Sequence, residues 1–216
     1  MPDSTSIVFV VDDDESLRRS LERLLRVSGH PVRSFASAAA FLDHPDPDGP
    51  CCLLLDIRMP QLTGLDVQRA VNAADRALPV ILMTGFADID TCVAGMKAGA
   101  ADFLLKPFDD HQLLSAVGSA LRRSQDVRQA RAEYRALLRR FDLLTQRERQ
   151  VFNLVSEGLL NKQIAGRLGT KEGTVKLHRA NLVRKLEARS VTDLVRMSDR
   201  LRHHAAPPTS AIQVSA

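Results

Sequence analysis

The sequence has 216 residues, 44% of them hydrophobic, which suits one large or two small domains with a buried core. It has no run of about eighteen or more apolar residues, and no basic patch followed by an apolar stretch after Met1, so neither a transmembrane helix nor a signal peptide is expected. Residues 1–121 hold 10 Lys/Arg and 17 Asp/Glu, a net charge of −7, whereas residues 122–216 hold 20 and 9, a net charge of +11. This asymmetry indicates that the second half binds a polyanion, although a solvated basic surface would give the same charge.

The first half alternates short apolar runs with amphipathic segments. The runs expected to be strands are residues 7–11, 32–35, 51–55, 79–83 and 101–105. The segments expected to be helices are residues 16–27, 38–42, 65–74, 88–98 and one that begins at Asp109, with Gly29 and Gly99 ending two of them. This alternation predicts an α/β fold with a doubly wound, five-stranded parallel sheet.

Polar residues stand at the carboxyl ends of four of these strands. They are Asp12 and Asp13 after the first strand, Asp56 after the third, Thr84 after the fourth and Lys106 after the fifth. Each of them alone is most simply a solvated strand end. Since ligands of open parallel sheets bind at this edge, their common position predicts one site.

Three carboxylates at close range are stable as anions only beside a cation, and the chemistry of the set favours Mg²⁺. Nearby His or Cys ligands are missing from the set, which disfavours zinc. A carboxylate can attack phosphorus, a reaction that needs mainly alignment and neutralised charge. We therefore expect Asp56 to be the nucleophile, Asp12 and Asp13 to bind the metal, Lys106 to be the counter-ion, and the Thr84 hydroxyl to donate to a phosphoryl oxygen.

The segments VVDDDES, LLLDIRMP, LMTGFAD and MKAGAADFLLKPF resemble, in order and spacing, the receiver domains of two-component response regulators over about residues 6–122. The resemblance implies a flavodoxin-like fold and a sensor histidine kinase that donates its phosphoryl group to Asp56. It also implies that Asp13 is the main metal ligand, that Asp12 acts through water, and that Asp56 and the main-chain carbonyl of Arg58 complete the Mg²⁺ site.

The same resemblance gives Phe103 the role of the aromatic residue that turns inward when Thr84 moves toward the phosphoryl group; without it, Phe103 would be an ordinary core residue. It further implies a cis peptide bond between Lys106 and Pro107. Two positions depart from the family pattern. Phe86 is larger than the residue usual there and is expected to pack over the site, and Asp14 is an additional carboxylate that we expect to be solvated.

A long amphipathic helix is predicted across residues 115–140, because apolar residues recur every three or four positions between many arginines. It would act either as a rigid spacer or as a dimer seam or docked surface. The three cysteines, Cys51, Cys52 and Cys92, lack the spacing of metal ligands, and we interpret them as buried free thiols in a reducing cytoplasm.

The second half is predicted to be helical. Thr145 and Glu148 form a capping box before a helix that Gly158 ends, and Asn161 is expected to cap the next, short helix. Gly169 would make the turn into a third helix over residues 172–186. Ser190 and Asp193 form a second capping box, before a last helix. Four short helices with a tight glycine turn indicate a helix-turn-helix module.

The third of these helices has the composition of a recognition helix. For base contact we expect Lys176, Leu177 and Arg179, with Asn181 as a further candidate, because such side chains suit base edges in the major groove. Contacts to phosphates are expected from Lys162, Lys171, Arg184 and Lys185. His178 completes the set of predicted DNA-binding residues, each of which could instead belong to a solvated face.

The segment LTQRERQVFNLVSEGLLNKQIAGRLGTKEGTVKLHRANLVRKLEARSVTDLVRM closely resembles the LuxR-type DNA-binding domain. Together with a receiver, this resemblance implies the NarL/FixJ family of response regulators, and the GFADIDTCVAGMKAGAADFLLKPF segment favours its FixJ-like branch. Gly173 departs from the usual polar residue and should loosen the first turn of the recognition helix. The expected organisation is a receiver domain (1–122), a helical linker (123–141), a helix-turn-helix domain (142–203) and a disordered tail (204–216).

The function that these patterns imply is that of a cytoplasmic transcription regulator rather than an enzyme. Phosphorylation of Asp56 would favour a homodimer formed through the face around the fourth helix and the fifth strand, pair two DNA-binding domains on double-stranded DNA, and engage RNA polymerase. One alternative is a constitutive DNA-binding protein whose receiver only docks partners. An enzyme of the aspartyl-phosphate phosphatase type is disfavoured, since Arg58 stands where a second catalytic acid would be needed.

Overall fold

The computed structural model describes residues 6–45, 47–85 and 89–205, and only the backbone of residues 89–92, 204 and 205. The chain divides into two compact units, residues 1–130 and 131–216. Among the described helices, none is both long and apolar enough to cross a lipid bilayer.

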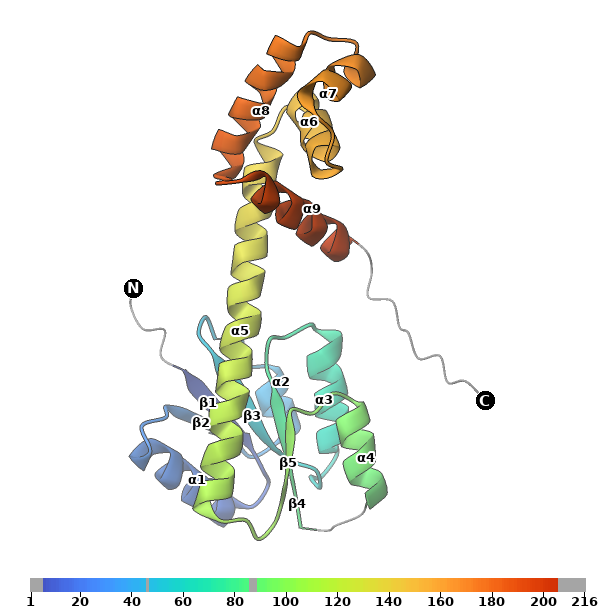
Figure 1. Cartoon of the computed structure of the whole chain (residues 1–216). Helices are drawn as coiled ribbons and strands as arrows, with labels where there is room; N and C mark the ends of the chain where they lie inside the picture. Colours follow the sequence, from blue (N-terminus) through green and yellow to red (C-terminus); the bar gives the residue numbers. More distant parts are fainter. Residues whose placement is uncertain (1–5, 46, 86–88, 206–216) are drawn as a thin grey trace. The chain divides into compact units, whose positions relative to one another are not determined.

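The first unit is built on a five-stranded parallel sheet (Figure 1). Its strands are β1 (Ile7–Val11), β2 (Val32–Phe35), β3 (Cys51–Asp56), β4 (Val80–Thr84) and β5 (Asp102–Leu105), in the spatial order β2-β1-β3-β4-β5. The helices are α1 (Glu15–Val27), α2 (Ala38–Leu42), α3 (Gly64–Ala73), α4 (Ile89–Lys97) and the start of α5 (Asp110–Asp142). The doubly wound α/β fold expected from the alternation is confirmed.

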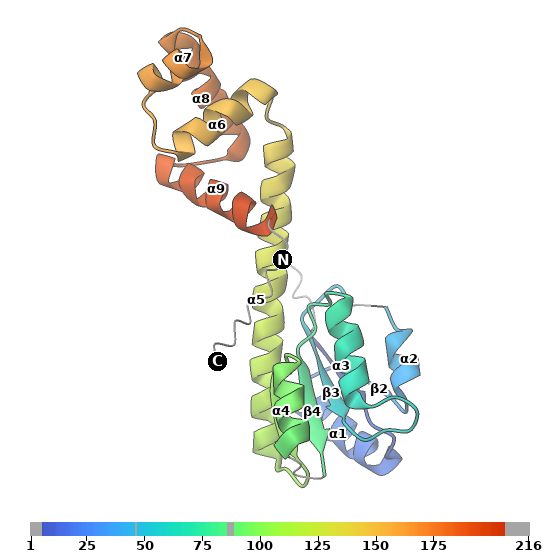
Figure 2. The same cartoon turned by 90° about the vertical axis from the view of Figure 1, so that its right-hand side faces the viewer.

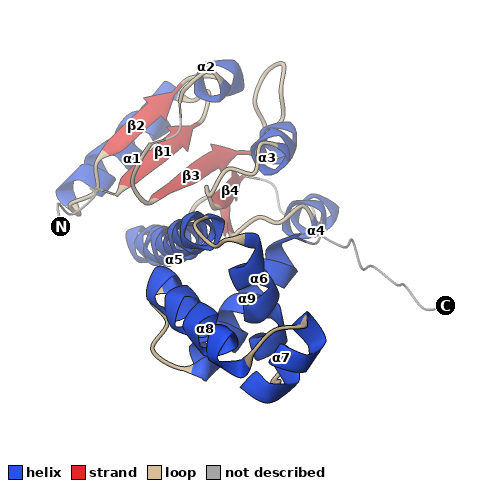
Figure 3. Cartoon of the chain, turned by 90° about the horizontal axis from the view of Figure 1, so that it is seen from above, coloured by secondary structure: helices blue, strands red, loops and turns tan. Residues whose placement is uncertain are grey.

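Helices cover both faces of this sheet (Figure 3). On one face, Phe41 of α2 and Val67 of α3 share a core with Phe9 of β1. On the other face, Leu25 of α1 and Val117 of α5 belong to a second core. Because both faces are covered, a central strand can be apolar throughout instead of alternating, and all residues of β3 are buried.

The long helix α5 is continuous from Asp110 to Asp142, as the apolar stripe predicted. Within the first unit, the Ser124 hydroxyl accepts a hydrogen bond from the Cys51 N–H and donates one to the Ala77 carbonyl, each at 3.0 Å. Within the second unit, Phe141 packs edge-to-face with Phe152, with ring centroids 5.4 Å apart. The first part of α5 is therefore hydrogen-bonded into the first unit, and its last turn packs into the core of the second unit.

The described part of the second unit contains four helices besides the end of α5: α6 (Gln146–Ser156), α7 (Asn161–Leu168), α8 (Glu172–Leu186) and α9 (Val191–Ala205) (Figure 2). Their shared core includes Phe152, Ile164, Leu182 and Leu194. Gly169 adopts a left-handed conformation with φ of 62° and makes the turn between α7 and α8. The predicted helix-turn-helix architecture is confirmed.

The predicted helix caps are only partly correct. The capping boxes Thr145–Glu148 and Ser190–Asp193 are present. The prediction for Asn161 is wrong, since α7 begins at Asn161 and its N-cap is Leu160. The Leu160 N–H is bonded to the Gln163 side chain at 2.8 Å, whereas Asn161 is used in a tertiary contact described below.

Asp14 is solvent-exposed, as expected, and it has a structural role in addition. It is the N-cap of α1, and its carboxylate accepts hydrogen bonds from the N–H groups of Ser16 at 2.8 Å and Leu17 at 3.2 Å. Cys51 and Cys52 are buried free thiols, as expected, and the Cys92 side chain lies outside the described residues.

Candidate functional site

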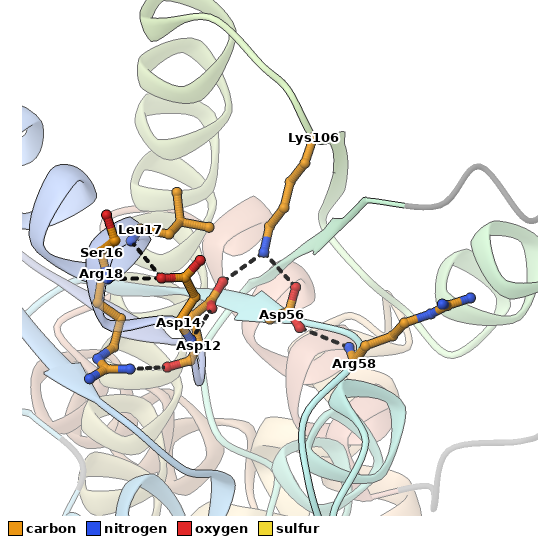
Figure 4. Close-up of polar contacts among 8 residues, drawn as sticks. All are labelled: Asp12, Asp14, Ser16, Leu17, Arg18, Asp56, Arg58 and Lys106. Carbon is orange, nitrogen blue, oxygen red and sulfur yellow. Dashed lines mark hydrogen bonds and ion pairs between the residues drawn. The ribbon is translucent and has the colours of Figure 1, made fainter.

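Side chains from three strand ends meet at the carboxyl edge of the sheet. The ammonium group of Lys106, just after β5, lies 2.7 Å from Oδ2 of Asp12, just after β1, and 2.7 Å from Oδ1 of Asp56, the last residue of β3 (Figure 4). The Lys106 N–H donates to the carbonyl of Thr84, at the end of β4, at 2.7 Å. The sheet topology therefore gathers these four residues at one edge, as the sequence predicted.

Burial dominates the electrostatics of Asp56. Burial in the crevice raises the pKa of its carboxyl group, and the Asp12 carboxylate adds to this, while the hydrogen bond and charge of Lys106 act in the opposite direction without cancelling it. Burial alone would lower the pKa of Lys106, but its two carboxylate partners outweigh burial and raise it. Lys106 therefore remains charged and is shared between two acids.

The loop after β1 holds Asp12 and leaves Asp13 exposed. Oδ1 of Asp12 accepts from the Asp14 N–H at 2.9 Å, and the main-chain oxygen of Asp12 accepts from the Arg18 guanidinium at 2.7 Å. The Arg58 N–H donates to Oδ2 of Asp56 at 2.9 Å. Figure 4 shows the Arg58 side chain extending away from this pair of acids, so that only its main chain faces them.

No group of three or more His, Cys, Asp or Glu side chains lies close enough together, within the described ranges, to form a metal site by itself. The structure thus places Asp12 and Asp56 together around Lys106 but does not bring the Asp13 carboxylate to them. Phe103 is half-buried against the core on the α2–α3 face of the sheet. The expectation for Phe86 concerns a residue outside the described part of the chain.

The predicted DNA-binding residues fall into two groups. The first group is exposed: Lys162 on α7, Lys171 at the N-cap of α8, and Lys176, Leu177 and Arg184 on α8. The second group is partly buried: His178, Arg179, Asn181 and Lys185. The basic face of α8 is therefore only partly free to reach a ligand.

Two of the partly buried residues make tertiary contacts. The Arg179 guanidinium donates to Oδ1 of Asn161 at 2.9 Å, which links α8 to the start of α7. The Lys185 ammonium lies 2.6 Å from the Glu148 carboxylate and 3.0 Å from the Leu143 carbonyl. These contacts support the fold of the unit, whichever residues bind DNA.

Sequence reasoning did not single out Arg18. It stands on the helix that follows the acidic run, and its contact with the Asp12 carbonyl joins residues six positions apart. The sequence feature that could have pointed to Arg18 is a basic residue near the start of a helix that begins at the site. Exposed arginines in the same helix carry the same signal, so the sequence alone does not distinguish Arg18 from them.

The fold and the site define a class of protein. Residues 8–118 match the family model described as response regulator receiver domain, and residues 142–198 match the one described as bacterial regulatory proteins, luxR family. The chain belongs to the response regulators that join a receiver to a LuxR-type helix-turn-helix domain. In this family phosphorylation controls the regulation of transcription; the receiver implies a histidine kinase as partner, and the LuxR-type domain implies DNA.

Individual relatives agree over most of the chain. Nodulation protein W of Bradyrhizobium diazoefficiens is 46% identical over 196 residues, which cover 91% of this chain and 86% of that protein. The transcriptional regulatory protein FixJ of Azorhizobium caulinodans is 43% identical and covers 92% of this chain and 93% of its own. The solved structure of the response regulator StyR is 44% identical, has a TM-score of 0.81, and covers 91% of this chain and 99% of its own.

Proposed function

We propose that Asp56 is the phosphoacceptor of this response regulator, with Asp12, Asp13, Lys106 and Thr84 as its working partners. The observation that carries the proposal is the ammonium of Lys106, held at 2.7 Å from both Asp12 and Asp56. The Lys106 ammonium would neutralise negative charge on the phosphoryl group while the neighbouring Asp56 carboxylate attacks the phosphorus. The domain limits that go with this proposal are those expected from the sequence: 1–122, 123–141, 142–203 and a tail of 204–216.

In the proposed transfer, a carboxylate oxygen of Asp56 forms a bond to the phosphorus of a kinase phosphohistidine, and the phosphorus–nitrogen bond breaks. The electron pair stays with the imidazole nitrogen, which takes up a proton. The donor oxygens near Asp56 suit Mg²⁺, which commonly uses only one or two carboxylates and keeps several waters. Asp12, Asp13, Asp56 and the main-chain carbonyl of Arg58 would hold it, and it would neutralise charge on the phosphoryl oxygens when bound.

The surface of the first unit suggests how phosphorylation would lead to dimerisation. Thr84 would donate to a phosphoryl oxygen and Phe103 would turn inward, which would alter the face made by α4 and β5. That face carries the exposed apolar side chains Val93, Met96 and Leu105, which supports its use in a homodimer. A homodimer would pair two DNA-binding units on a roughly two-fold DNA site and position them to engage RNA polymerase.

For the DNA complex we propose base contacts by Lys176 and Leu177, whose exposure supports this role, and by Arg179, held by Asn161. Asn181 and His178 are adjacent candidates. Phosphate contacts are proposed for Lys162, Lys171 and Arg184, and a weaker one for Lys185, whose ammonium is already paired with Glu148. Since DNA is the ligand and a kinase the donor, we infer a cytoplasmic regulator that is not an enzyme.

The experiment is acetyl phosphate treatment of the full chain with Mg²⁺, read by intact mass, together with light scattering, on wild type and Asp56→Asn. The expected result is a phosphoryl mass gain and a dimer in wild type, and neither in the variant. An unmodified wild type, under conditions that label another receiver, would favour the alternative of a constitutive DNA-binding protein with a docking receiver. Labelling that persists in Asp56→Asn would place the phosphoacceptor elsewhere.

A further inference from the structure

A side chain of α1 holds the main chain between the two acids that follow β1. Nη1 of Arg18 donates to the main-chain oxygen of Asp12 at 2.7 Å (Figure 4). That oxygen belongs to the planar peptide group that joins Asp12 to Asp13. Its orientation therefore sets the direction in which the chain enters Asp13.

The Asp12 side chain does not depend on this contact. Its Oδ1 accepts from the Asp14 N–H at 2.9 Å and its Oδ2 accepts from Lys106 at 2.7 Å. The Asp12 N–H donates to the Phe35 carbonyl at 3.3 Å. Loss of Arg18 would leave these three bonds in place and release only the peptide oxygen.

Asp13 is in the opposite situation. It is exposed, and its carboxylate has no hydrogen bond to the described part of the chain. Without a partner, this carboxylate can turn about its side-chain bonds, and the backbone fixes only the position from which it reaches a ligand. We propose that Arg18 is a positioning residue that, through the Asp12–Asp13 peptide group, fixes the backbone from which the Asp13 side chain turns to bind Mg²⁺, an inference that rests on the proposed function.

A purely structural role for Arg18 predicts a different result. If the contact only fastened α1 to β1, its loss would lower the melting temperature and leave the affinity for Mg²⁺ unchanged. If it orients Asp13, its loss lowers the affinity for Mg²⁺, since groups that orient metal ligands typically contribute about 10–100-fold to metal affinity. Binding of the metal, rather than stability, separates the two roles.

The matched control is the next residue of the same helix. Arg19 is exposed, and its guanidinium pairs at 2.5 Å with the carboxylate of Glu15 on the same helix. Arg18→Met and Arg19→Met thus remove the same charge and leave the same unbranched, apolar side chain. Arg18→Lys keeps the charge but loses the planar guanidinium, so it tests geometry apart from charge.

The measurement is calorimetric titration of the full chain with Mg²⁺ alone, at a temperature where each variant is folded by circular dichroism. We expect the Kd to rise about tenfold in Arg18→Met, less in Arg18→Lys, and not in Arg19→Met. In an Asp13→Asn background, Arg18→Met should add nothing further, since the group that it positions is gone. Equal Kd values for Arg18→Met and Arg19→Met would overturn the inference.

A second readout is the rate of acetyl phosphate labelling against Mg²⁺ concentration. For Arg18→Met we expect a lower rate at low Mg²⁺ that recovers at saturating Mg²⁺. A rate that stays low at saturation, with an unchanged Kd, would contradict the positioning role. A wild type that binds Mg²⁺ but takes no phosphoryl group would defeat the proposed function instead, and the Mg²⁺ titration would still decide the role of Arg18.

Discussion

Lys185, in the last turn of the recognition helix, forms an ion pair of 2.6 Å with Glu148, in the first turn of α6. The Glu148 side chain is buried and also accepts the Thr145 N–H at 2.8 Å, as part of the capping box. Lys185, whose position on α8 suggests a phosphate contact, therefore links α8 to α6.

We expect Glu148→Gln to lower the stability of the second unit by about 1–2 kcal/mol at neutral pH, because glutamine can complete the capping box but cannot pair with Lys185. Burial raises the pKa of Glu148, but the hydrogen bond from Lys185 and that from the Thr145 N–H outweigh it and hold the pKa below the ordinary 4.5.

A lowered carboxyl pKa contributes stability above the ordinary pKa, and this contribution is lost as the pH falls through the folded-state pKa. The difference between wild type and Glu148→Gln should therefore shrink as the pH falls below the ordinary carboxyl pKa and through the lower folded-state pKa. Calorimetry between acidic and neutral pH checks this, with Glu157→Gln as the exposed control. A difference that does not change with pH would contradict the ion-pair account.

The two kinds of lysine should differ in DNA binding. We expect Lys171→Ala to weaken binding to all sequences and to reduce the slope of log affinity against log salt by about 1, the effect of one lost phosphate contact. Lys185→Ala should lower the melting temperature with a smaller change in slope, because its ammonium is already paired. Fluorescence anisotropy at several salt concentrations measures both; equal slopes for the two variants would refute the distinction.

Gly64 should not tolerate a side chain. A Cβ there would lie 2.5 Å from the Asp56 carbonyl oxygen and 2.9 Å from Cα of Ile57, so the chain next to Asp56 must shift. We expect Gly64→Ala to destabilise the first unit by about 1–3 kcal/mol and to slow labelling of Asp56. Gly173→Ala, where no atom lies within 4 Å, is the matched control, and it should stabilise α8 by about 0.5–1 kcal/mol. Normal labelling and stability in Gly64→Ala would show that the loop adapts.

Neutralising Asp56 should stabilise the metal-free protein. Burial, and after it the nearby Asp12, raise the pKa of Asp56 above the ordinary 3.8, so ionisation of this side chain costs stability; the cost grows as the pH rises above the ordinary pKa and is complete above the folded-state pKa. We expect Asp56→Asn to be more stable than wild type at neutral pH in EDTA, and to lose this advantage as the pH falls toward the ordinary pKa.

Asp66 is a control for this prediction, because its pKa is shifted in the opposite direction from that of Asp56. Hydrogen bonds from the Thr63 hydroxyl and N–H lower its pKa, so Asp66→Asn should be less stable than wild type at neutral pH. Thermal unfolding of both variants across the acidic range makes the comparison. A destabilised Asp56→Asn at neutral pH would show that the bond to Lys106 outweighs burial.

Much of the fold was predictable because its signals are local or periodic. Apolar runs ending in Asp56 and Thr84 indicate parallel strands, and the carboxyl ends of such strands share one edge. Gly169, needed for a left-handed turn, and the Thr145–Glu148 capping box mark helix ends within a few residues. The cis peptide bond at Lys106–Pro107, which followed from the family resemblance, is present.

The sequence by itself determined the succession of strands and helices along the chain, the two domain types, and the position of Asp12, Asp56 and Lys106 at one sheet edge. Only the tertiary structure decided which polar side chains pair. Asn161 bonds Arg179 instead of capping α7, Lys185 binds Glu148, and Arg18 holds the Asp12 carbonyl. The physical reason is that a helix or strand follows from periodicity along the chain, whereas a hydrogen bond between elements depends on distances that exist only after packing.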